Sequence, residues 1–407
     1  MHIREINIDG TRVWKFTQDK GDLGYLGIDT DIAGKSCGGL RYLEGVDAEE
    51  IAGLARAMTL KYGFLGLPQG GAKAGIIAVS GESDSERKQK LEDFGKALSP
   101  WLKKGAYFPG TDMGINIDDL NIILESAGIR LKPWQLGCRF SGAYTAATVF
   151  AGIVAACRRK DRPLDSCTFA IEGFGAVGGS LARFLHDSGC LVTAVATRSG
   201  AVYCEKGLDI PLLLARAEHG EKDLFCDLPG ASQITREELL ELPVDILSPC
   251  ARHNSVNAQN AGNIKAWAII SGANNPVTSD AEKILLSRNI LSIPDFVTNS
   301  GGVLGGTMSF AGIEHIRIIR LITDSFQPLY TDLFIRSERQ GISVREYAEK
   351  LALKRFQQVK KASENLTITG RIFQLGLLSY RAGLVPKSLM GRISMPFFKK
   401  LPVFRGY

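Results

Sequence analysis

The sequence predicts an α/β protein of two domains, the second built around a mostly parallel sheet. The chain has 407 residues, which suggests two domains, or at most three, at roughly 150 residues each. In the second half, short apolar runs alternate with helical stretches, as they do in βαβ units. One of these runs leads directly into a glycine-rich G-x-G-x-x-G segment. Together these features favour a parallel sheet that binds a ligand at its carboxyl edge.

Composition excludes several classes of protein. Hydrophobic residues make up 45% and charged residues 23% of the chain, so bulk disorder is excluded. No apolar run reaches the roughly 18 residues of a transmembrane helix, and the N-terminus lacks the apolar core of a signal peptide. The net charge of +6 is too diffuse to indicate nucleic-acid binding. The eight cysteines lack C-x-x-C spacing, so we expect reduced thiols, no metal site and a cytoplasmic location.

The first domain is expected to span residues 1–140. Short apolar runs between 11 and 32 predict paired strands. Asp47, followed by Glu50, predicts the N-cap of a helix over 47–61. A glycine-rich loop over 66–75, a helix over 83–99 and a Pro/Gly loop that leads to Asp112 complete the expected order of elements.

The second domain is expected to span 141–335. An alanine-rich helix over 142–158 opens it, and apolar strands are expected at 168–171, 191–196, 245–247, 268–270 and 290–293. Residues 336–407 read as helices that pack back on the first domain. Within this tail, residues 395–400 are basic and aromatic. We expect them to be solvated or to contact another subunit, and a contact with a membrane is the alternative.

The glycine-rich segment has the signature of a Rossmann dinucleotide site. In this motif the first glycine permits a tight turn, the second lets the backbone approach a pyrophosphate, and the third lets the helix pack against the strand. The alternative is a glycine-rich turn without a ligand. The expected cofactor-binding residues here are Gly173, Phe174, Gly175, Ala176, Val177 and Gly178.

The next strand runs into Thr197 and Arg198 instead of the acidic residue that binds the ribose hydroxyls of NAD. Because arginine can pair with a 2′-phosphate, we expect the chain to accept NADP or to prefer it to NAD. The alternative is that Arg198 is a solvated loop charge.

Two lysines stand out in the first domain. Lys61 follows Met-Thr-Leu near a helix end, and Lys73 lies in a glycine-rich segment. A desolvated lysine, or one beside another cation, loses proton affinity and can act as a base. Asp112 could exchange protons with an amine. From spacing alone, ordinary surface lysines are the more common explanation.

The chain resembles the glutamate/leucine/phenylalanine/valine dehydrogenases over about residues 10–310. The matching segments occur in the family order, with spacing similar to the family's. Besides the glycine fingerprint, they are Gly38-Gly39-Leu40-Arg41, Met58-Thr59-Leu60-Lys61, Gly70-Gly71-Ala72-Lys73, Pro109-Gly110-Thr111-Asp112, Asp245-Ile246-Leu247-Ser248-Pro249-Cys250-Ala251, Gly272-Ala273-Asn274-Asn275 and Pro294-Asp295 through Asn299-Ser300-Gly301-Gly302-Val303.

The resemblance implies NAD(P)-dependent oxidative deamination of an L-amino acid to a 2-oxo acid and ammonium, together with the reverse reaction. It implies that Lys61 holds the substrate carboxylate, that Lys73 activates water, and that Asp112 moves protons to and from the nitrogen. It places Thr145, Asn274 and Asn299 near the nicotinamide and its ribose, and Cys250 and Ala251 at the cofactor. It also implies that the first domain binds substrate and forms a homo-oligomer.

Two positions bear on the substrate. Glutamate enzymes of the family carry a lysine before the Gly38-Gly39 pair and a serine after the Gly-Gly-Val, and this chain has Cys37 and Gly306 there. An anionic side chain buried without a partner would cost several kcal/mol. We therefore expect an apolar or aromatic amino acid and a closer similarity to the leucine/phenylalanine branch. Lys35 could still reach the pocket, which leaves a glutamate dehydrogenase with a rebuilt pocket as an alternative.

Several residues depart from the family pattern, among them Glu172, Thr197, Arg252 and His253. A non-catalytic dinucleotide-binding or regulatory homologue is therefore a further alternative. The presence of both lysines and Asp112 speaks against it, because a protein that had lost catalysis need not keep all three. His253 is read as a loop histidine at the cofactor rim and not as a catalytic group.

Overall fold

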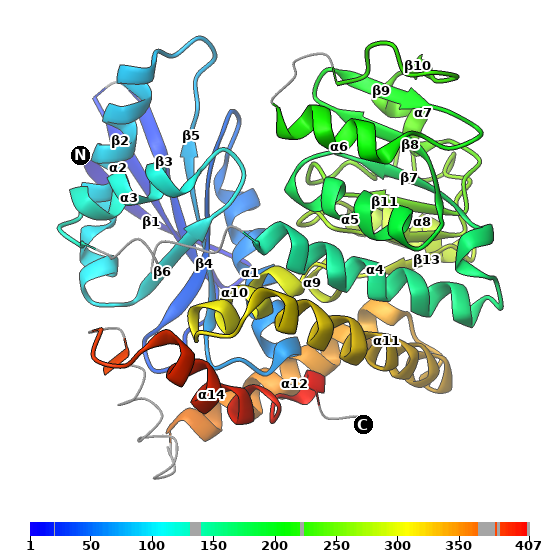
Figure 1. Cartoon of the computed structure of the whole chain (residues 1–407). Helices are drawn as coiled ribbons and strands as arrows, with labels where there is room; N and C mark the ends of the chain where they lie inside the picture. The colour runs from blue at the N-terminus through cyan, green and yellow to red at the C-terminus, as the bar shows by residue number, and fades with distance from the viewer. Residues whose placement is uncertain (20, 131–139, 220–223, 365–378, 381–382, 405–407) are drawn as a thin grey trace. The chain divides into compact units, whose positions relative to one another are not determined.

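The computed structural model describes residues 1–19, 21–130, 140–219, 224–364, 379–380 and 383–404. The chain forms two compact units (Figure 1). One contains Met1–Cys138 and Leu351–Pro386, and the other contains Arg139–Lys350 and Lys387–Tyr407. The tail from residue 336 is thus divided between the two units, and the expected boundary between residues 140 and 141 directly follows residues 131–139, which lie outside the described ranges.

A six-stranded mixed sheet forms the centre of the first unit. Its strand order is β1-β2-β3-β5-β4-β6. The pairs from β1 to β5 are antiparallel, whereas β4 pairs in parallel with both β5 and β6. The paired strands expected between residues 11 and 32 are confirmed as β2 and β3. The strands are β1 (His2–Ile8), β2 (Thr11–Gln18), β3 (Gly21–Ile28), β4 (Ser36–Leu43), β5 (Gly70–Ile77) and β6 (Tyr107–Thr111).

Three helices pack on this sheet, and their ends follow the expected capping chemistry. The Asp47 side chain accepts a hydrogen bond from the Glu50 amide, as predicted, and Gly66 ends the first helix in a left-handed conformation. Ser83 caps the second helix through a capping box. The helices are α1 (Ala48–Leu65), α2 (Asp84–Lys103) and α3 (Ile117–Ser126).

Two expected loops are strands, which corrects the sequence-based prediction. Most of the glycine-rich segment is β5, and the segment before Asp112 is β6. The glycines of β5 reflect close packing and not a turn. A Cβ atom on Gly71 would lie 2.3 Å from the Thr59 backbone nitrogen, and one on Gly70 would lie 2.2 Å from the Thr30 carbonyl oxygen.

The two faces of this sheet differ in chemistry because side chains alternate along a strand. Leu40, Tyr42, Ala72 and Ala74 belong to the apolar core that α2 and α3 complete. The intervening residues of β4 and β5 face the α1 side, where a Cβ on Gly75 would meet Ile51 of α1. Charged and small residues therefore collect beneath α1.

The second unit contains a seven-stranded sheet in the order β10-β9-β8-β7-β11-β12-β13. The strands from β8 to β13 in this order are parallel, and β9 and β10 extend the sheet in antiparallel fashion. All five expected strands are present. The strands are β7 (Thr168–Glu172), β8 (Leu191–Thr197), β9 (Gly200–Tyr203), β10 (Ser232–Ile234), β11 (Ile246–Pro249), β12 (Ala268–Ile270) and β13 (Leu291–Ile293).

The helices of this unit confirm the α/β alternation, and the Rossmann-like sheet is as predicted. Helix α4 packs against both α5 and α11 (Figure 1). The helices are α4 (Ser141–Arg159), α5 (Ala176–Asp187), α6 (Ile210–Glu218), α7 (Arg236–Leu240), α8 (Ser279–Ser287), α9 (Asp295–Thr298), α10 (Gly301–Phe310), α11 (His315–Gln340), α12 (Val344–Glu364), which runs across the boundary in sequence between the units, and α14 (Lys387–Phe398), with short 3-10 turns at Leu164–Ser166 and Pro402–Phe404.

The sheet order creates a switch point between β7 and β11. The chain passes from β7 to β8 on one side, and later returns to place β11 on the other side of β7. At such a point the crevice outside the carboxyl ends of the strands is the usual ligand site. The glycine fingerprint lies directly after β7 and therefore at this point.

Three further findings bear on function. Within the described part of the chain, no helix is long and apolar enough to span a membrane. Those residues also contain no cluster of three or more metal-ligand side chains. The seven described cysteines are free thiols, and Cys138 lies outside the described residues.

Candidate functional site

Lys73 and Asp112 form an ion pair on the face of the first sheet that α1 covers. The Lys73 Nζ lies 2.6 Å from the Asp112 Oδ2, and the two side chains are 3% and 12% exposed. Lys73 is contributed by β5, and Asp112 directly follows β6. The strand pairing of β4 with both neighbours brings these distant segments together. The predicted proximity of the two residues is thus present.

Arg41, on β4, joins the pair from the opposite side. Its Nη2 and Nε lie 2.8 and 2.9 Å from the same Asp112 Oδ2, and its Nη1 binds the Glu50 carboxylate. Arg41 is 1% exposed. Two cations and two carboxylates thus neutralise one another in a space that water scarcely enters.

The arrangement moves the pKa values of both partners downward. Burial lowers the pKa of Lys73, and the charge of Arg41 acts in the same direction, whereas Asp112 opposes the shift. Burial alone would raise the pKa of Asp112, but the charges of Lys73 and Arg41 hold it well below its usual range. Lys73 can therefore release its proton more easily than an exposed lysine while Asp112 stays ionised.

Sequence reasoning missed Arg41 and Glu50 as members of this cluster. Arg41 lay in a recognised motif without an assigned role, and Glu50 was interpreted only through helix capping. The available signal was an arginine in the middle of an apolar strand, because a charge at such a position requires a buried partner. Gly39 completes the cluster: a Cβ there would lie 2.9 Å from the Asp112 Cβ and 3.1 Å from the Lys73 Nζ.

The other predicted substrate residues lie on the same strand or on α1. Cys37 precedes Gly38 on β4, and burial raises the pKa of its thiol, which lies beside the Tyr62 hydroxyl. A Cβ on Gly38 would lie 1.6 Å from the Ala72 carbonyl oxygen, so only glycine fits. Lys61, on α1, is 4% exposed, whereas Lys35 is exposed.

The glycine fingerprint of the second unit has the expected division of roles. Gly173 has a φ of 104°, which only glycine adopts readily, and a Cβ on Gly178 would lie 1.8 Å from the Gly173 carbonyl oxygen. A Cβ on Gly175 would meet nothing within 4 Å. The first and third glycines are therefore required by the fold itself, whereas the second faces open space before the N-terminus of α5.

The predicted ribose-binding turn follows β8. The Thr197 Oγ1 lies 2.9 Å from the Ser199 Oγ and accepts a hydrogen bond from the Ser199 amide at 3.3 Å. Arg198, between them, is exposed, and no ion pair links it to another described residue. Its guanidinium is available to an anion.

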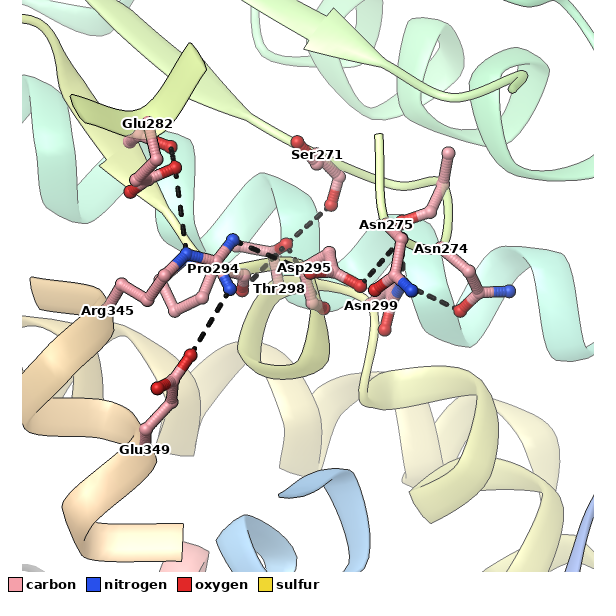
Figure 2. Close-up of polar contacts among 12 residues, drawn as sticks. Ser271, Asn274, Asn275, Glu282, Pro294, Asp295, Thr298, Asn299, Arg345 and Glu349 are labelled. Atoms are coloured by element: carbon pink, nitrogen blue, oxygen red, sulfur yellow. Dashed lines mark hydrogen bonds and ion pairs between the residues drawn. The ribbon is translucent and has the colours of Figure 1, made fainter. Parts of the chain in front are cut away.

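Asn274 and Asn299 are joined by a hydrogen bond, as Figure 2 shows. The Asn299 Nδ2 donates to the Asn274 Oδ1 at 3.0 Å and to the Ala273 carbonyl at 2.7 Å. The Asn299 Oδ1 is buried and has no hydrogen-bond partner among the described residues. An unpaired buried acceptor costs free energy, and an amide donor such as that of nicotinamide would satisfy it.

Thr145 and Gly306, the remaining predicted residues of this unit, lie on α4 and α10. The Thr145 hydroxyl donates to the Ser141 carbonyl at 3.0 Å, and a Cβ on Gly302 would lie 2.6 Å from that hydroxyl. A Cβ on Gly306 would meet nothing within 4 Å. The absence of a side chain at 306 thus leaves open space.

Cys250 and Ala251 lie just beyond β11, beside the fingerprint. The Cys250 amide donates to the Glu172 carbonyl at 2.7 Å, and a Cβ on Gly173 would lie 2.8 Å from the Ala251 Cβ. The Glu172 side chain, which sequence analysis noted only as a departure, has a buried Oε2 without a hydrogen-bond partner among the described residues. Burial raises the pKa of Glu172 to about 7, although Ser255 and Arg252 oppose the shift.

The residues at the carboxyl edge of the second sheet fit a dinucleotide. The open space at Gly175, the exposed Arg198 and the unpaired Asn299 oxygen match the three parts of such a ligand, namely the pyrophosphate, the adenosine ribose and the nicotinamide. The first sheet offers a different chemistry, which is a buried lysine beside an ionised carboxylate.

Comparisons with known proteins agree with this division. Residues 14–128 match the Glu/Leu/Phe/Val dehydrogenase dimerisation domain, and residues 137–363 match Glutamate/Leucine/Phenylalanine/Valine dehydrogenase. The chain is 36% identical over 294 residues to the catabolic NAD-specific glutamate dehydrogenase RocG of Bacillus subtilis, which covers 69% of the chain and 68% of that protein. It is 32% identical over 367 residues to glutamate dehydrogenase B of Halobacterium salinarum, with 83% of each chain covered.

Solved structures show the same fold. The hetero-hexameric glutamate dehydrogenase of Thermus thermophilus in its leucine-bound form superposes with a TM-score of 0.72 at 25% identity, over 88% of each chain. The L-tryptophan dehydrogenase of Nostoc punctiforme has a TM-score of 0.59 at 24% identity, over 86% of this chain and 97% of that one, and so supports the fold alone.

The curated relatives named here are glutamate dehydrogenases, so the expected closeness to the leucine/phenylalanine branch is not supported. The family itself is shown by matches that cover most of the chain. The chain belongs to the glutamate/leucine/phenylalanine/valine dehydrogenase family and is an amino-acid dehydrogenase.

Proposed function

We propose that the chain catalyses NAD-dependent oxidative deamination of an L-amino acid to a 2-oxo acid and ammonium, and the reverse reductive amination. The observation that carries this proposal is the contact of 2.6 Å between Lys73 and Asp112, buried beside Arg41. Burial lowers the pKa of Lys73, so its amine is deprotonated more readily than that of an exposed lysine and can take a proton from water. The nicotinamide, when bound, accepts the hydride from the substrate α-carbon.

In this proposal each charged group has one task. Lys61 holds the substrate α-carboxylate, because a buried ammonium binds such a group well. Lys73 takes a proton from the water that adds to the α-carbon after the hydride has left. The proton that Lys73 has taken from water then passes through the adjoining Asp112 carboxylate to the departing nitrogen, which leaves as ammonia, and Arg41 holds that carboxylate in position.

A Lys73→Ala variant tests the proposal. We expect kcat to fall by roughly 10²–10⁴-fold, which is the contribution of a positioned general base. The fold should survive, because Asp112 keeps its contact with Arg41. Unchanged turnover, or a wild-type protein that binds dinucleotide but turns over no amino acid, would contradict the proposal and favour a regulatory homologue.

We further propose an apolar or aromatic amino acid as the preferred substrate. Cys37 and Gly306 supply no charge at the two positions where glutamate enzymes carry lysine and serine. Glutamate is the second candidate, since the relatives named above are glutamate dehydrogenases, and Lys35 offers a charge nearby in sequence. An activity screen of twenty amino acids with NAD and NADP separates the candidates; glutamate as the sole substrate would refute the apolar pocket.

The cofactor proposal has two parts. The NAD-specific names of relatives support the use of NAD. The exposed Arg198, and the absence of an acid after β8, support acceptance of NADP as well. Michaelis constants for the two cofactors test the second part, which a preference for NAD of more than about tenfold would overturn.

From the resemblance to the family we also propose a homo-oligomer formed through the first domain. The relative from Thermus thermophilus is described as hetero-hexameric, and residues 14–128 match a dimerisation domain. The mass of the purified protein in solution tests this expectation.

A further inference from the structure

We propose that Arg345 is a positioning residue for the nicotinamide side of the cofactor site, acting through Asp295. The inference rests on the proposed function, because it assigns Asn274 and Asn299 to the nicotinamide. It concerns residues of the second unit only. Figure 2 shows the contacts on which it depends.

Arg345 lies in the first turn of α12, among three carboxylates. Its guanidinium is 3.6 Å from the Glu282 Oε2, 3.8 Å from the Asp295 Oδ1 and 3.5 Å from the Glu349 Oε1. The Glu282 and Asp295 side chains are only 14% and 4% exposed, whereas Glu349 is 41% exposed. Arg345 is therefore the cation that compensates two buried carboxylates.

The Asp295 carboxylate connects this cation to Asn275, the residue next to Asn274. The Oδ2 of Asp295 accepts a hydrogen bond from the Asn275 amide at 2.9 Å, and the backbone carbonyl of Asp295 accepts one from the Asn299 amide at 2.8 Å. Asn275 has a φ of 47°, a left-handed conformation that is uncommon for residues other than glycine, although asparagine adopts it more readily than most. The hydrogen bond that the Asn275 amide donates to Asp295 helps to hold that conformation and thus the position of the neighbouring Asn274.

The surroundings would not hold this arrangement without the arginine. A cavity of about 610 Å³ lies against Asn275, Asp295 and Arg345, so the loop that carries Asn275 has room to move. Glu282 and Asp295 repel each other, and this repulsion contributes to the raised pKa of Glu282, which burial dominates. Removal of Arg345 would expose Asp295 to that repulsion and loosen its hold on Asn275.

The test compares Arg345→Met with Glu349→Gln, which removes only the exposed member of the cluster. For each we would measure the dissociation constants of NADH and of ADP-ribose, which lacks the nicotinamide, together with kcat and both KM values. We expect Arg345→Met to weaken NADH about tenfold and to lower kcat by up to about 10²-fold, since small displacements of reacting groups have effects of that order. ADP-ribose binding and the KM for the amino acid should change less than about twofold, and Glu349→Gln should resemble the wild type.

A purely structural role would give another pattern. In that case Arg345→Met would lower the melting temperature and leave the ratio of the NADH and ADP-ribose constants unchanged, which would overturn the inference. The double variant Glu282→Gln/Arg345→Met removes the opposing charge along with the arginine and provides a folded protein if the single variant is unstable. It should recover stability together with most of the NADH affinity, because the repulsion that displaces Asp295 is removed; a double variant that regains stability while NADH binding stays about tenfold weaker would also overturn the inference.

Failure of the proposed function gives a result of its own. If the wild type binds ADP-ribose and NADH with equal affinity, contacts with the nicotinamide contribute nothing to the affinity, and the assignment of Asn274 and Asn299 is wrong. If the wild type prefers NADH and Arg345→Met keeps the same preference, only the role of Arg345 is wrong.

Discussion

Two groups of buried polar side chains, one beneath α1 and one at the carboxyl edge of the second sheet, differ in how they are paired. Beneath α1, the charges of Lys73, Asp112 and Arg41 satisfy one another. At the carboxyl edge of the second sheet, Glu172 and Asn299 each have a buried oxygen without a partner among the described residues. The charges of the first group are paired with one another, whereas the oxygens of the second are open to a hydrogen-bond donor, as the proposed cofactor site requires. Buried polar atoms are normally paired, so unpaired ones mark where a partner is missing.

The largest expected effect tests whether the first region is a closed charge network. Arg41→Met removes one of the two cations from Asp112 and the arginine from Glu50. Breaking a buried ion pair on one side typically costs about 3–5 kcal/mol of unfolding free energy, which urea denaturation measures. Arg56→Met is the matched control, because Arg56 is 46% exposed and pairs with Asp29 at 3.4 Å. An equal loss of unfolding free energy in both variants would show that the buried charges contribute no more to stability than an exposed ion pair.

The next effect tests the buried Glu172 carboxylate, whose Oε2 has no hydrogen-bond partner among the described residues. Its pKa in the folded protein, about 7, is above the ordinary value of 4.5, so the folded state binds the proton more tightly than the unfolded state. Its contribution to stability is therefore fully present below about pH 4.5 and is lost as the pH rises through 7. The loss amounts to at most roughly 3 kcal/mol, from about 1.4 kcal/mol per pKa unit.

We expect Glu172→Gln to remove this pH dependence and to be more stable than the wild type at pH 8 but not at pH 5. Urea midpoints at the two pH values measure the difference. Glu237→Gln, an exposed acid on α7, serves as the control. The same pH slope in the wild type and in Glu172→Gln would show that the carboxylate is already satisfied.

The sequence alone predicts more of the second sheet than of the first. The second sheet was predictable strand by strand, because each parallel strand is a short apolar run and Gly173 to Gly178 follow one of them directly. In the first sheet, Gly70 and Gly71 were interpreted as a loop, since glycine signals turns more often than close packing. Arg41 and Glu50 could not be joined from sequence, because strand pairing, and not spacing, brings Arg41 to Asp112. The network of Arg345 likewise joins segments that are far apart in sequence.

A pair of glycine variants tests which part of the fingerprint serves the fold and which serves the ligand. A Cβ on Gly178 would lie 1.8 Å from a backbone oxygen, whereas one on Gly175 would meet nothing within 4 Å. We expect Gly178→Ala to cost about 1–3 kcal/mol of unfolding free energy through overpacking. Gly175→Ala should leave stability unchanged and raise the cofactor KM. If the two variants lose stability equally, the open space at Gly175 is not reserved for a ligand.

The smallest expected effect concerns Arg198, which faces solvent in the turn after β8. If its guanidinium pairs with a 2′-phosphate, Arg198→Ala should lower kcat/KM for NADP by about tenfold, or roughly 1.4 kcal/mol, and leave the value for NAD unchanged. Initial rates with both cofactors measure this. Arg183→Ala, which removes an exposed arginine that pairs with Glu218, controls for the loss of surface charge. A similar change with both cofactors would show that Arg198 acts only through the overall electrostatic attraction of the protein for anionic cofactors, because only a contact with the 2′-phosphate distinguishes NADP from NAD.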